Sequence, residues 1–186
     1  AGTHGTGWVL DENHILTNWH VTDFMPDPIT MTTYDGNTLF GSVVASEEFD
    51  DISVIRLSQP TSLAPLPISS NRAEVGDPVY FVGHPGSIGD WIIGAGVVTE
   101  YDEFFKEFVR STLPADPGAS GSAMLNLDGE VVALISGCMG GEVDENPPKG
   151  DGSVVYSAVP SQQVNENCGG TEIEKVMSFY ESSVAG

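Results

Sequence analysis

Residues 116–122, with the sequence Asp-Pro-Gly-Ala-Ser-Gly-Ser, place a serine inside a glycine-bracketed turn. A serine hydroxyl is a good nucleophile only when a neighbouring base accepts its proton, and its attack on a carbonyl creates an oxyanion that needs hydrogen-bond donors. Gly118 and Gly121 lack a Cβ, so the backbone can turn sharply there and direct N–H groups at a substrate. The heptad alone is equally typical of a plain turn. If Ser120 is a nucleophile, other residues must supply a base and a group that orients it.

Two residues earlier in the chain could fill those roles. His20 follows the run Ile15-Leu16-Thr17-Asn18-Trp19, and Asp51 directly precedes the alternating segment Ile52-Ser53-Val54-Ile55-Arg56-Leu57. An imidazole accepts a proton near neutral pH, and a carboxylate can hold its tautomer. Each residue alone also fits a structural position, as a core histidine or a strand-start aspartate. Asp50 is a rival to Asp51, which we prefer because it borders the strand.

Other catalytic and binding signatures fail on spacing. The nucleophile elbow of α/β-hydrolases needs a glycine where Ser122 stands, and it places its acid and histidine after the serine. His4, His14 and His84 have no partner at metal-ligand spacing, and the chain has no His-Glu-x-x-His, so we expect structural or surface roles for them. Phosphate-loop and dinucleotide signatures are absent as well. We predict no metal and no cofactor.

The charge balance excludes several kinds of partner. The 186 residues include 27 acidic and 6 basic side chains, a net charge of −21. Such a surface repels nucleic acid and anionic lipid. No apolar run reaches the roughly 20 residues of a membrane span, and no signal peptide opens the chain, which predicts a cytosolic or an already processed protein. The carboxylates are spread along the chain like a solvated shell, which leads to the hypothesis of a salt-adapted protein.

Cys138 and Cys168 are the two cysteines. Two thiols cannot form a cysteine-rich zinc site. A bridge between them would close a loop of roughly 30 residues and add about 3 kcal/mol in the chain-entropy model. Two buried free thiols are an equal alternative.

The chain as a whole is typical of an all-β protein. It has 22 Gly, 12 Pro and many β-branched residues, which favour short strands joined by turns. The pattern predicts two strand-rich halves that form two small antiparallel barrels. Strands are expected at residues 5–10, 14–18, 29–34, 39–45, 52–57, 77–83, 91–99, 104–111, 122–127, 131–136 and 153–159.

The domain organisation follows from the breaks in this pattern. We expect an N-terminal barrel over 1–62, a linker over 63–75, a C-terminal barrel over 76–168 and a helix over 169–186. The Pro- and Ser-rich composition of the linker favours a connection between two units. Thr171 and Glu174 form a capping box, and the helix presents an apolar face. That face consists of Ile173, Val176, Met177 and Tyr180.

The order His20, Asp51, Ser120 resembles the trypsin/chymotrypsin superfamily of serine proteases. The segments around these three residues are similar to the superfamily's strand pair ending in the histidine, its aspartate segment and its nucleophile loop. Residues 82–86, 94–98 and 125–132 look like the bacterial branch that includes the high-temperature-requirement proteases. The resemblance covers residues 5 to about 160. It implies two six-stranded antiparallel β-barrels of chymotrypsin-like fold with a C-terminal helix.

The resemblance also implies roles. Ser120 would be the nucleophile, His20 the general base and Asp51 the residue that orients the imidazole. The N–H groups of Gly118 and Ser120 would form the oxyanion hole. The rate would then rise with pH through the titration of His20, near 7. Ala119 stands where trypsin-like zymogens carry an acid, so activation by a new N-terminus is not expected.

Specificity is predicted by the same resemblance. Pro114, six residues before the nucleophile, would lie at the base of the primary pocket, and it offers no charge. Ile135, Ser136 and Gly137 would form the strand that pairs with the substrate backbone. We expect a preference for a small or medium uncharged residue before the cut.

Three function classes fit the sequence. The first is a serine endopeptidase acting on polypeptide substrates through an acyl-enzyme, in a secreted or extracytoplasmic location. The second is a protease-fold binding module with a collapsed oxyanion hole. The third is the protease part of an assembly-dependent chaperone-protease. The sequence leaves the oligomeric state open.

Overall fold

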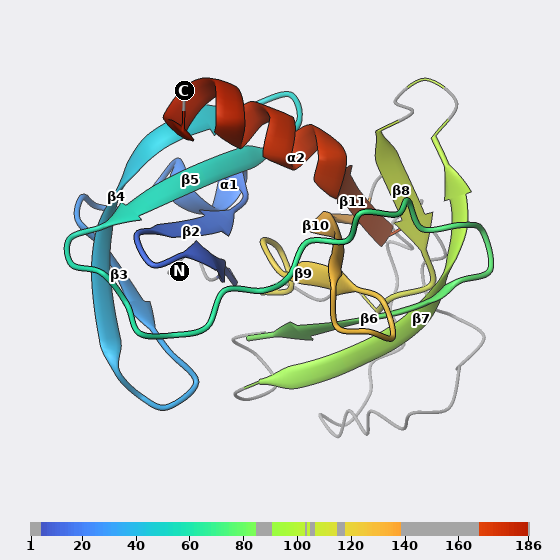
Figure 1. Ribbon diagram of the computed structural model, residues 1–186, viewed down its shortest axis with the longest axis horizontal. Helices are drawn as coiled ribbons and strands as arrows, with labels where there is room; N and C mark the ends of the chain where they lie inside the picture. The colour runs from blue at the N-terminus through green and yellow to red at the C-terminus, as the bar shows by residue number, and fades with distance from the viewer. Residues whose placement is uncertain are drawn as a thin grey trace, which may run out of the picture.

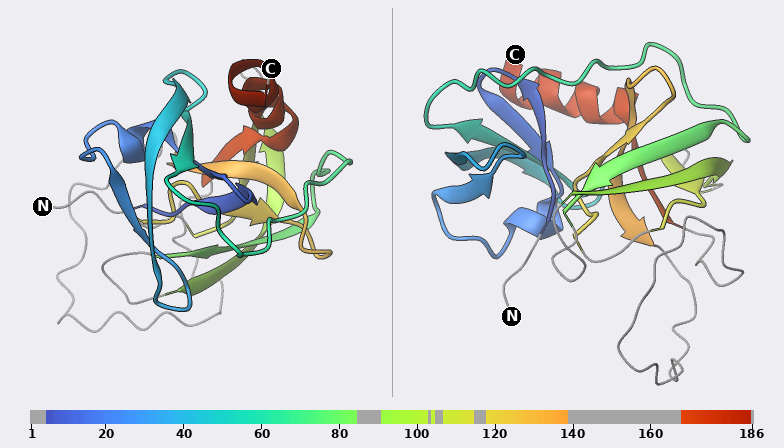
Figure 2. Two further views of the ribbon diagram at one scale, coloured as in Figure 1. Left: turned by 60° about the vertical axis from the view of Figure 1, so that its left-hand side comes forward. Right: turned by 90° about the horizontal axis from the view of Figure 1, so that it is seen from below.

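The computed structural model describes residues 5–84, 91–102, 104, 107–114, 118–138 and 168–185. Figure 2 shows two strand-rich halves side by side, joined by segment 58–75. The elements are β1 (Trp8–Asp11), β2 (His14–Thr17), α1 (Trp19–Thr22), β3 (Ile29–Thr32), β4 (Thr38–Glu47), β5 (Ile52–Leu57), β6 (Pro78–Gly83), β7 (Ile92–Tyr101), β8 (Phe108–Ser111), β9 (Ala123–Leu125), β10 (Val131–Cys138), β11 (Cys168–Glu172), α2 (Ile173–Tyr180) and the π-helical turn η1 (Glu181–Ala185).

The N-terminal half is an antiparallel sheet with the strand order β1-β2-β5-β4-β3 (Figure 1). The strands predicted over 5–10, 14–18, 29–34 and 39–45 are present, and they pair as the two hairpins β1–β2 and β3–β4. The alternating segment Ile52–Leu57 forms β5, which pairs with β2 on one side and β4 on the other. Five strands are present among the described residues, and β1 and β3 are the edges of the sheet.

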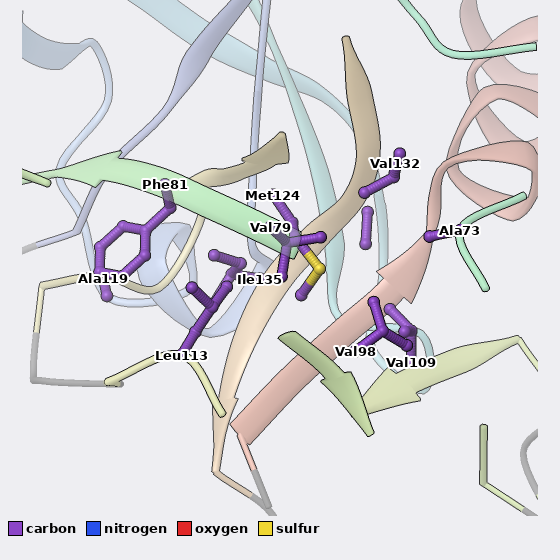
Figure 3. Packing of buried hydrophobic residues seen from close by; sticks show 11 residues of the cluster. Ala73, Val79, Phe81, Val98, Val109, Leu113, Ala119, Met124, Val132 and Ile135 are labelled. Atoms are coloured by element: carbon purple, nitrogen blue, oxygen red, sulfur yellow. The ribbon is translucent and has the colours of Figure 1, made fainter. Parts of the chain in front are cut away.

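The C-terminal half is a closed barrel with the strand order β10-β11-β8-β7-β6-β9. Its interior is filled by apolar side chains that point toward one another in Figure 3, among them Phe81, Met124 and Ile135. Met124 is fully buried. The predicted all-β fold with a six-stranded barrel and a C-terminal helix is confirmed. The N-terminal half differs from the prediction of a second six-stranded barrel, because among the described residues it is an open sheet of five strands. The predicted strand over 153–159 lies outside the described residues.

β11 is a strand that the sequence did not predict. Residues 168–172 were expected to contain the start of the helix, but they pair with β10 and β8 and close the barrel. A Cβ at Gly169 would lie 1.9 Å from the Val109 carbonyl oxygen, and one at Gly170 would lie 1.9 Å from that of Leu134. Glycines here admit close strand contact, and they also erase the apolar alternation that marks a strand.

The predicted capping box is therefore wrong. Thr171 belongs to β11, and its hydroxyl donates to the Asp50 carbonyl oxygen at 2.9 Å. α2 begins at Ile173 with Glu172 as its N-cap residue, without a side-chain cap. The boundaries of the two predicted barrels and the linker stay predictions.

α2 packs against both halves of the molecule. Its residues Ile173 and Val176 are buried in one cluster with Trp8 and Val54 of the sheet and Leu134 of the barrel. Figure 1 shows the helix crossing from β11 toward β4 and β5. The predicted apolar face is confirmed, since Met177 and Tyr180 pack against the same cluster. Among the described residues, no helix is long and apolar enough to span a bilayer.

A polar cluster fixes the end of α2 to the first hairpin. The Tyr180 hydroxyl donates to Asp11 Oδ2 at 2.8 Å, and His14 Nδ1 lies 2.9 Å from Asp11 Oδ1. Burial and the hydrogen bond to Asp11 raise the pKa of Tyr180 to about 12. His14 is buried, and its Nε2 lies 3.5 Å from Arg56 Nε. These contacts fit the structural or surface role expected for His14, which stays a prediction.

β10 and β11 place the backbones of Cys138 and Cys168 directly opposite each other. Opposed residues of antiparallel strands have Cα atoms about 4.5–5.5 Å apart, inside the range that a disulfide spans. The register therefore permits a bridge, and the bridge stays a prediction.

Candidate active site

His20 and Asp51 form the best-defined polar contact of the candidate site. β2 ends at Thr17, and the single turn α1 turns the imidazole toward the start of β5. His20 Nδ1 lies 2.7 Å from Asp51 Oδ2, and the His20 backbone N–H donates to Asp51 Oδ1 at 3.0 Å. One carboxylate thus holds both the ring and the backbone of the histidine.

Asp51 is itself held in an uncommon conformation. Its φ is +55°, in the left-handed region that non-glycine residues seldom adopt. The side-chain amide of Asn18 donates to the Asp51 carbonyl oxygen at 2.9 Å, which ties this backbone to the end of β2. Strained backbone of this kind persists where the surroundings fix it, and such positions cluster at functional sites.

The pKa of His20 is raised above its ordinary value of 6.5. The hydrogen bond to the Asp51 carboxylate is the main cause, and partial burial opposes it. With Nδ1–H donating to the carboxylate, the neutral ring presents Nε2 as an acceptor. The half-exposed ring therefore carries a basic nitrogen at its free edge.

Ser120 lies in the turn between β8 and β9 and is half-buried. Its hydroxyl donates to the Ser136 carbonyl oxygen at 3.3 Å. Within the described part of the chain it makes no hydrogen bond with His20. Catalytic hydrogen bonds are often long or unformed without substrate, so this geometry does not exclude the pair.

The turn around Ser120 is fixed against β10. The Gly121 N–H donates to the Ile135 carbonyl at 2.8 Å, and the Ile135 N–H donates to the Ser122 carbonyl at 2.9 Å. Gly118 and Gly121 have φ of +110° and +86°. A Cβ at Gly121 would lie 2.0 Å from the Thr6 carbonyl oxygen, so this position requires glycine. Among the described residues, the N–H groups of Gly118 and Ser120 donate to no carbonyl.

The predicted specificity residues divide into two groups. Ile135, Ser136 and Gly137 all lie on β10, and the Ser136 carbonyl touches the Ser120 hydroxyl. Pro114 is exposed after β8, and among the described residues no hydrogen bond links it to Ser120. The structure thus brings β10 to the candidate nucleophile and leaves the role of Pro114 a prediction.

Sequence reasoning missed two residues of this region. Asn18 is fully buried, and its amide also lies 3.5 Å from Ser136 Oγ, so it links the two halves beside Asp51. Thr6 is buried and hydrogen-bonded to the nucleophile turn. A polar residue inside the apolar run before His20 was the available signal for Asn18. Among the described residues, no three His, Cys, Asp or Glu side chains gather as a metal site.

The chain matches a known family over most of its length. Residues 5–134 match the model of the trypsin-like peptidase domain. The Synechocystis protein HhoA is 32% identical over 143 residues, which cover 70% of this chain and 36% of HhoA. The periplasmic serine endoprotease DegP of Escherichia coli is 25% identical over 169 residues, which cover 86% of this chain and 34% of DegP. The chain therefore spans about a third of the length of these curated relatives.

Solved structures show the same fold. The serine endoprotease from Yersinia pestis superposes with a TM-score of 0.76 at 19% identity, covering 97% of this chain and 57% of that one. Rv3671c from M. tuberculosis superposes with a TM-score of 0.71 at 16% identity, covering 97% of this chain and 82% of that one. At these identities the likeness concerns the fold alone.

Proposed function

Because the chain belongs to the trypsin-like peptidase family and its relative DegP is named a serine endoprotease, we propose that it hydrolyses peptide bonds with a His20–Asp51–Ser120 triad. The observation that carries the proposal is that the Asp51 carboxylate is hydrogen-bonded to both the ring and the backbone N–H of His20. This is the geometry that an oriented general base requires. The substrates are polypeptides.

The reaction begins with a rotation of the Ser120 hydroxyl from the Ser136 carbonyl toward His20. Its Oγ attacks the scissile carbonyl carbon while His20 Nε2 takes the hydroxyl proton. The tetrahedral intermediate collapses when His20 passes that proton to the leaving amine, which gives an acyl-enzyme. A water molecule then attacks the ester, His20 takes its proton, and the serine leaves with that proton.

Asp51 keeps the Nδ1–H of His20 pointing away from the substrate and stabilises the imidazolium that forms in each half-reaction. The raised pKa of His20 expresses this stabilisation. The N–H groups of Gly118 and Ser120 form the oxyanion hole. Losing one such donor costs roughly 3 kcal/mol of transition-state stabilisation.

The substrate binds as an added strand along Ile135, Ser136 and Gly137 of β10. Pro114 lines the pocket for the residue before the cut, which is small or medium and uncharged. Because the relative DegP is named as periplasmic, we place the protein in an extracytoplasmic compartment.

The pH dependence of peptide hydrolysis tests the proposal. Because the base must be neutral, kcat/KM rises with pH through the His20 pKa, and the midpoint lies above the ordinary 6.5. Asp51→Asn lowers kcat/KM by about 10⁴-fold and moves the midpoint to lower pH, because the carboxylate that raises the pKa is lost.

Asp50→Asn is the matched control, since the Asp50 carboxylate pairs with Lys175 Nζ at 3.2 Å. It leaves the profile unchanged. A flat profile from about pH 5 to 9, or a larger loss from the Asp50 variant, would contradict the assignment of His20 and Asp51.

An assembly-dependent protease part is a second candidate. It is favoured by the Ser120 hydroxyl, which donates to Ser136 in this chain and not to His20. In that case the isolated chain turns over no peptide, and the longer protein containing it does.

A further inference from the structure

Thr6 connects the coil before β1 to the turn that carries Ser120. Its side chain is buried, with 8% of the residue exposed. The Thr6 N–H donates to the Ser120 carbonyl at 2.8 Å, and the Thr6 hydroxyl donates to the Gly118 carbonyl at 2.6 Å. The same hydroxyl accepts from the His84 N–H at 3.0 Å. We infer that Thr6 is a positioning residue for the oxyanion hole, an inference that rests on the proposed function.

The two bonds from Thr6 lie on either side of one peptide group. The Gly118 carbonyl belongs to the peptide before Ala119, and the Ser120 carbonyl belongs to the peptide after Ser120. Between them lies the peptide that carries the Ser120 N–H, one of the two proposed oxyanion donors. Holding both neighbours fixes the direction of that N–H before the substrate arrives, which is the preorganisation that such a donor requires.

The Ser120 turn needs contacts from outside the turn to fix its conformation, because glycines flank it. Gly118 and Gly121 both have positive φ, where glycine changes conformation at low cost. The Thr6 carbonyl also accepts from the Thr17 hydroxyl at 2.7 Å, so Thr6 is anchored to the end of β2. The strand that leads to His20 thereby sets the position of the Ser120 turn.

The hydroxyl is the part of Thr6 that carries this role. Valine has the same shape without the hydroxyl, so it removes the bonds to Gly118 and His84 and keeps the backbone bond to Ser120. Serine keeps the hydroxyl and removes a methyl group. The two substitutions therefore separate hydrogen bonding from packing.

The experiment compares peptide hydrolysis by wild type, Thr6→Val, Thr6→Ser and Ser69→Ala. Ser69 is the matched control, because its buried hydroxyl donates to the Asn71 carbonyl and accepts from the Asn71 N–H in the linker. We expect Thr6→Val to lower kcat about 10- to 100-fold with KM unchanged, because a transition-state contact is weakened. A peptidyl aldehyde should lose affinity by the same factor. Thr6→Ser and Ser69→Ala should stay within about threefold of wild type.

Two results would overturn the inference: a Thr6→Val variant with wild-type kcat, or a Thr6→Ser variant as impaired as Thr6→Val. Amide hydrogen exchange of residues 118–122 gives a readout that does not depend on turnover. The Thr6→Val variant should exchange faster there than wild type, and Thr6→Ser should not. If wild type hydrolyses nothing while this exchange pattern holds, the proposed function fails and the positioning role stands; unchanged exchange in Thr6→Val would refute the role.

Discussion

The two halves of the molecule share one strand order. The C-terminal half closes into a barrel, and the N-terminal half is an open sheet among the described residues. Going round the barrel, β7, β8, β11, β10 and β9 follow one another, and β6 closes the ring by pairing with both β7 and β9. The sheet order β1-β2-β5-β4-β3 matches that series strand for strand. Among the described residues, no strand joins β1 to β3 as β6 joins its neighbours.

The difference lies in packing. Next to the free edge β3, the sheet has a cavity of about 460 Å³, which is lined by apolar side chains that include Ile15, Ile29 and Met31. The barrel interior holds a cluster of buried apolar side chains, among them Phe81, Met124 and Ile135 (Figure 3). His20 follows β2, and Asp51 directly precedes β5. These two strands pair with each other in the interior of the sheet. His20 and Asp51 thus depend on strands that are paired on both sides and not on the free edges.

Gly121→Ala gives the largest expected effect, because Gly121 lies where barrel and sheet meet. Its Cβ would overlap the Thr6 carbonyl and the Thr17 hydroxyl, and the residue has positive φ. We expect a loss of at least about 4 kcal/mol in the free energy of unfolding, measured by urea denaturation. Gly36→Ala is the control: its φ of +81° is similar, and a Cβ there meets nothing within 4 Å. It should cost only about 1 kcal/mol. If both variants lose the same free energy of unfolding, backbone strain alone causes the loss, and the two halves are not tightly packed at Gly121.

A pair of methionine truncations compares the two interiors directly. Met124 is fully buried in the closed barrel, and Met31 is partly buried beside the cavity of the sheet. Met124→Ala should cost about 3 kcal/mol, since it leaves a cavity in a packed core. Met31→Ala should cost less than about 1 kcal/mol, because part of its surface has no packing partner to lose. A larger loss at Met31 than at Met124 would contradict the contrast between a closed and an open interior.

Tyr180→Phe should have a small effect on the free energy of unfolding. It removes the hydroxyl that donates to Asp11 and keeps the ring against the core, so the loss should be about 1 kcal/mol. Tyr34→Phe, at a residue that is 78% exposed, should change nothing measurable in thermal unfolding. If Tyr180→Phe leaves the stability unchanged, burial of the apolar face alone holds α2 in place.

Elements with a clear period were predictable from the sequence, and elements fixed by close contact were not. β5 coincides with the strand predicted over residues 52–57, and α2 carries the predicted apolar face. β11 was missed because its glycines carry no strand pattern. They are needed because the carbonyl oxygens of Val109 and Leu134 leave no room for a Cβ, and the sequence does not show that these residues lie beside β11. α1 was missed because four residues are too few for a helical period.

The candidate site also has a part that the sequence predicted and a part that it did not. The motifs around His20, Asp51 and Ser120 predicted the family, and the comparisons confirm it. The roles of the three residues stay predictions. Thr6 could not be found from the sequence, because its hydroxyl acts on Gly118, 112 residues further along the chain. Asn18 offered one signal, a polar residue inside an apolar run, but the sequence does not show that its partner is Asp51, 33 residues away.

Labelling with a fluorophosphonate tests the central claim most directly, because only an activated serine displaces fluoride from phosphorus at a useful rate. We expect one label per chain, mapped to Ser120 by peptide mass spectrometry, and no label in Ser120→Ala. The reaction should be run at low and at multimolar salt, since the net charge of −21 suits a screened medium. Labelling that persists in Ser120→Ala, or wild-type protein that stays unlabelled at every salt concentration, would contradict an assembled triad in this chain.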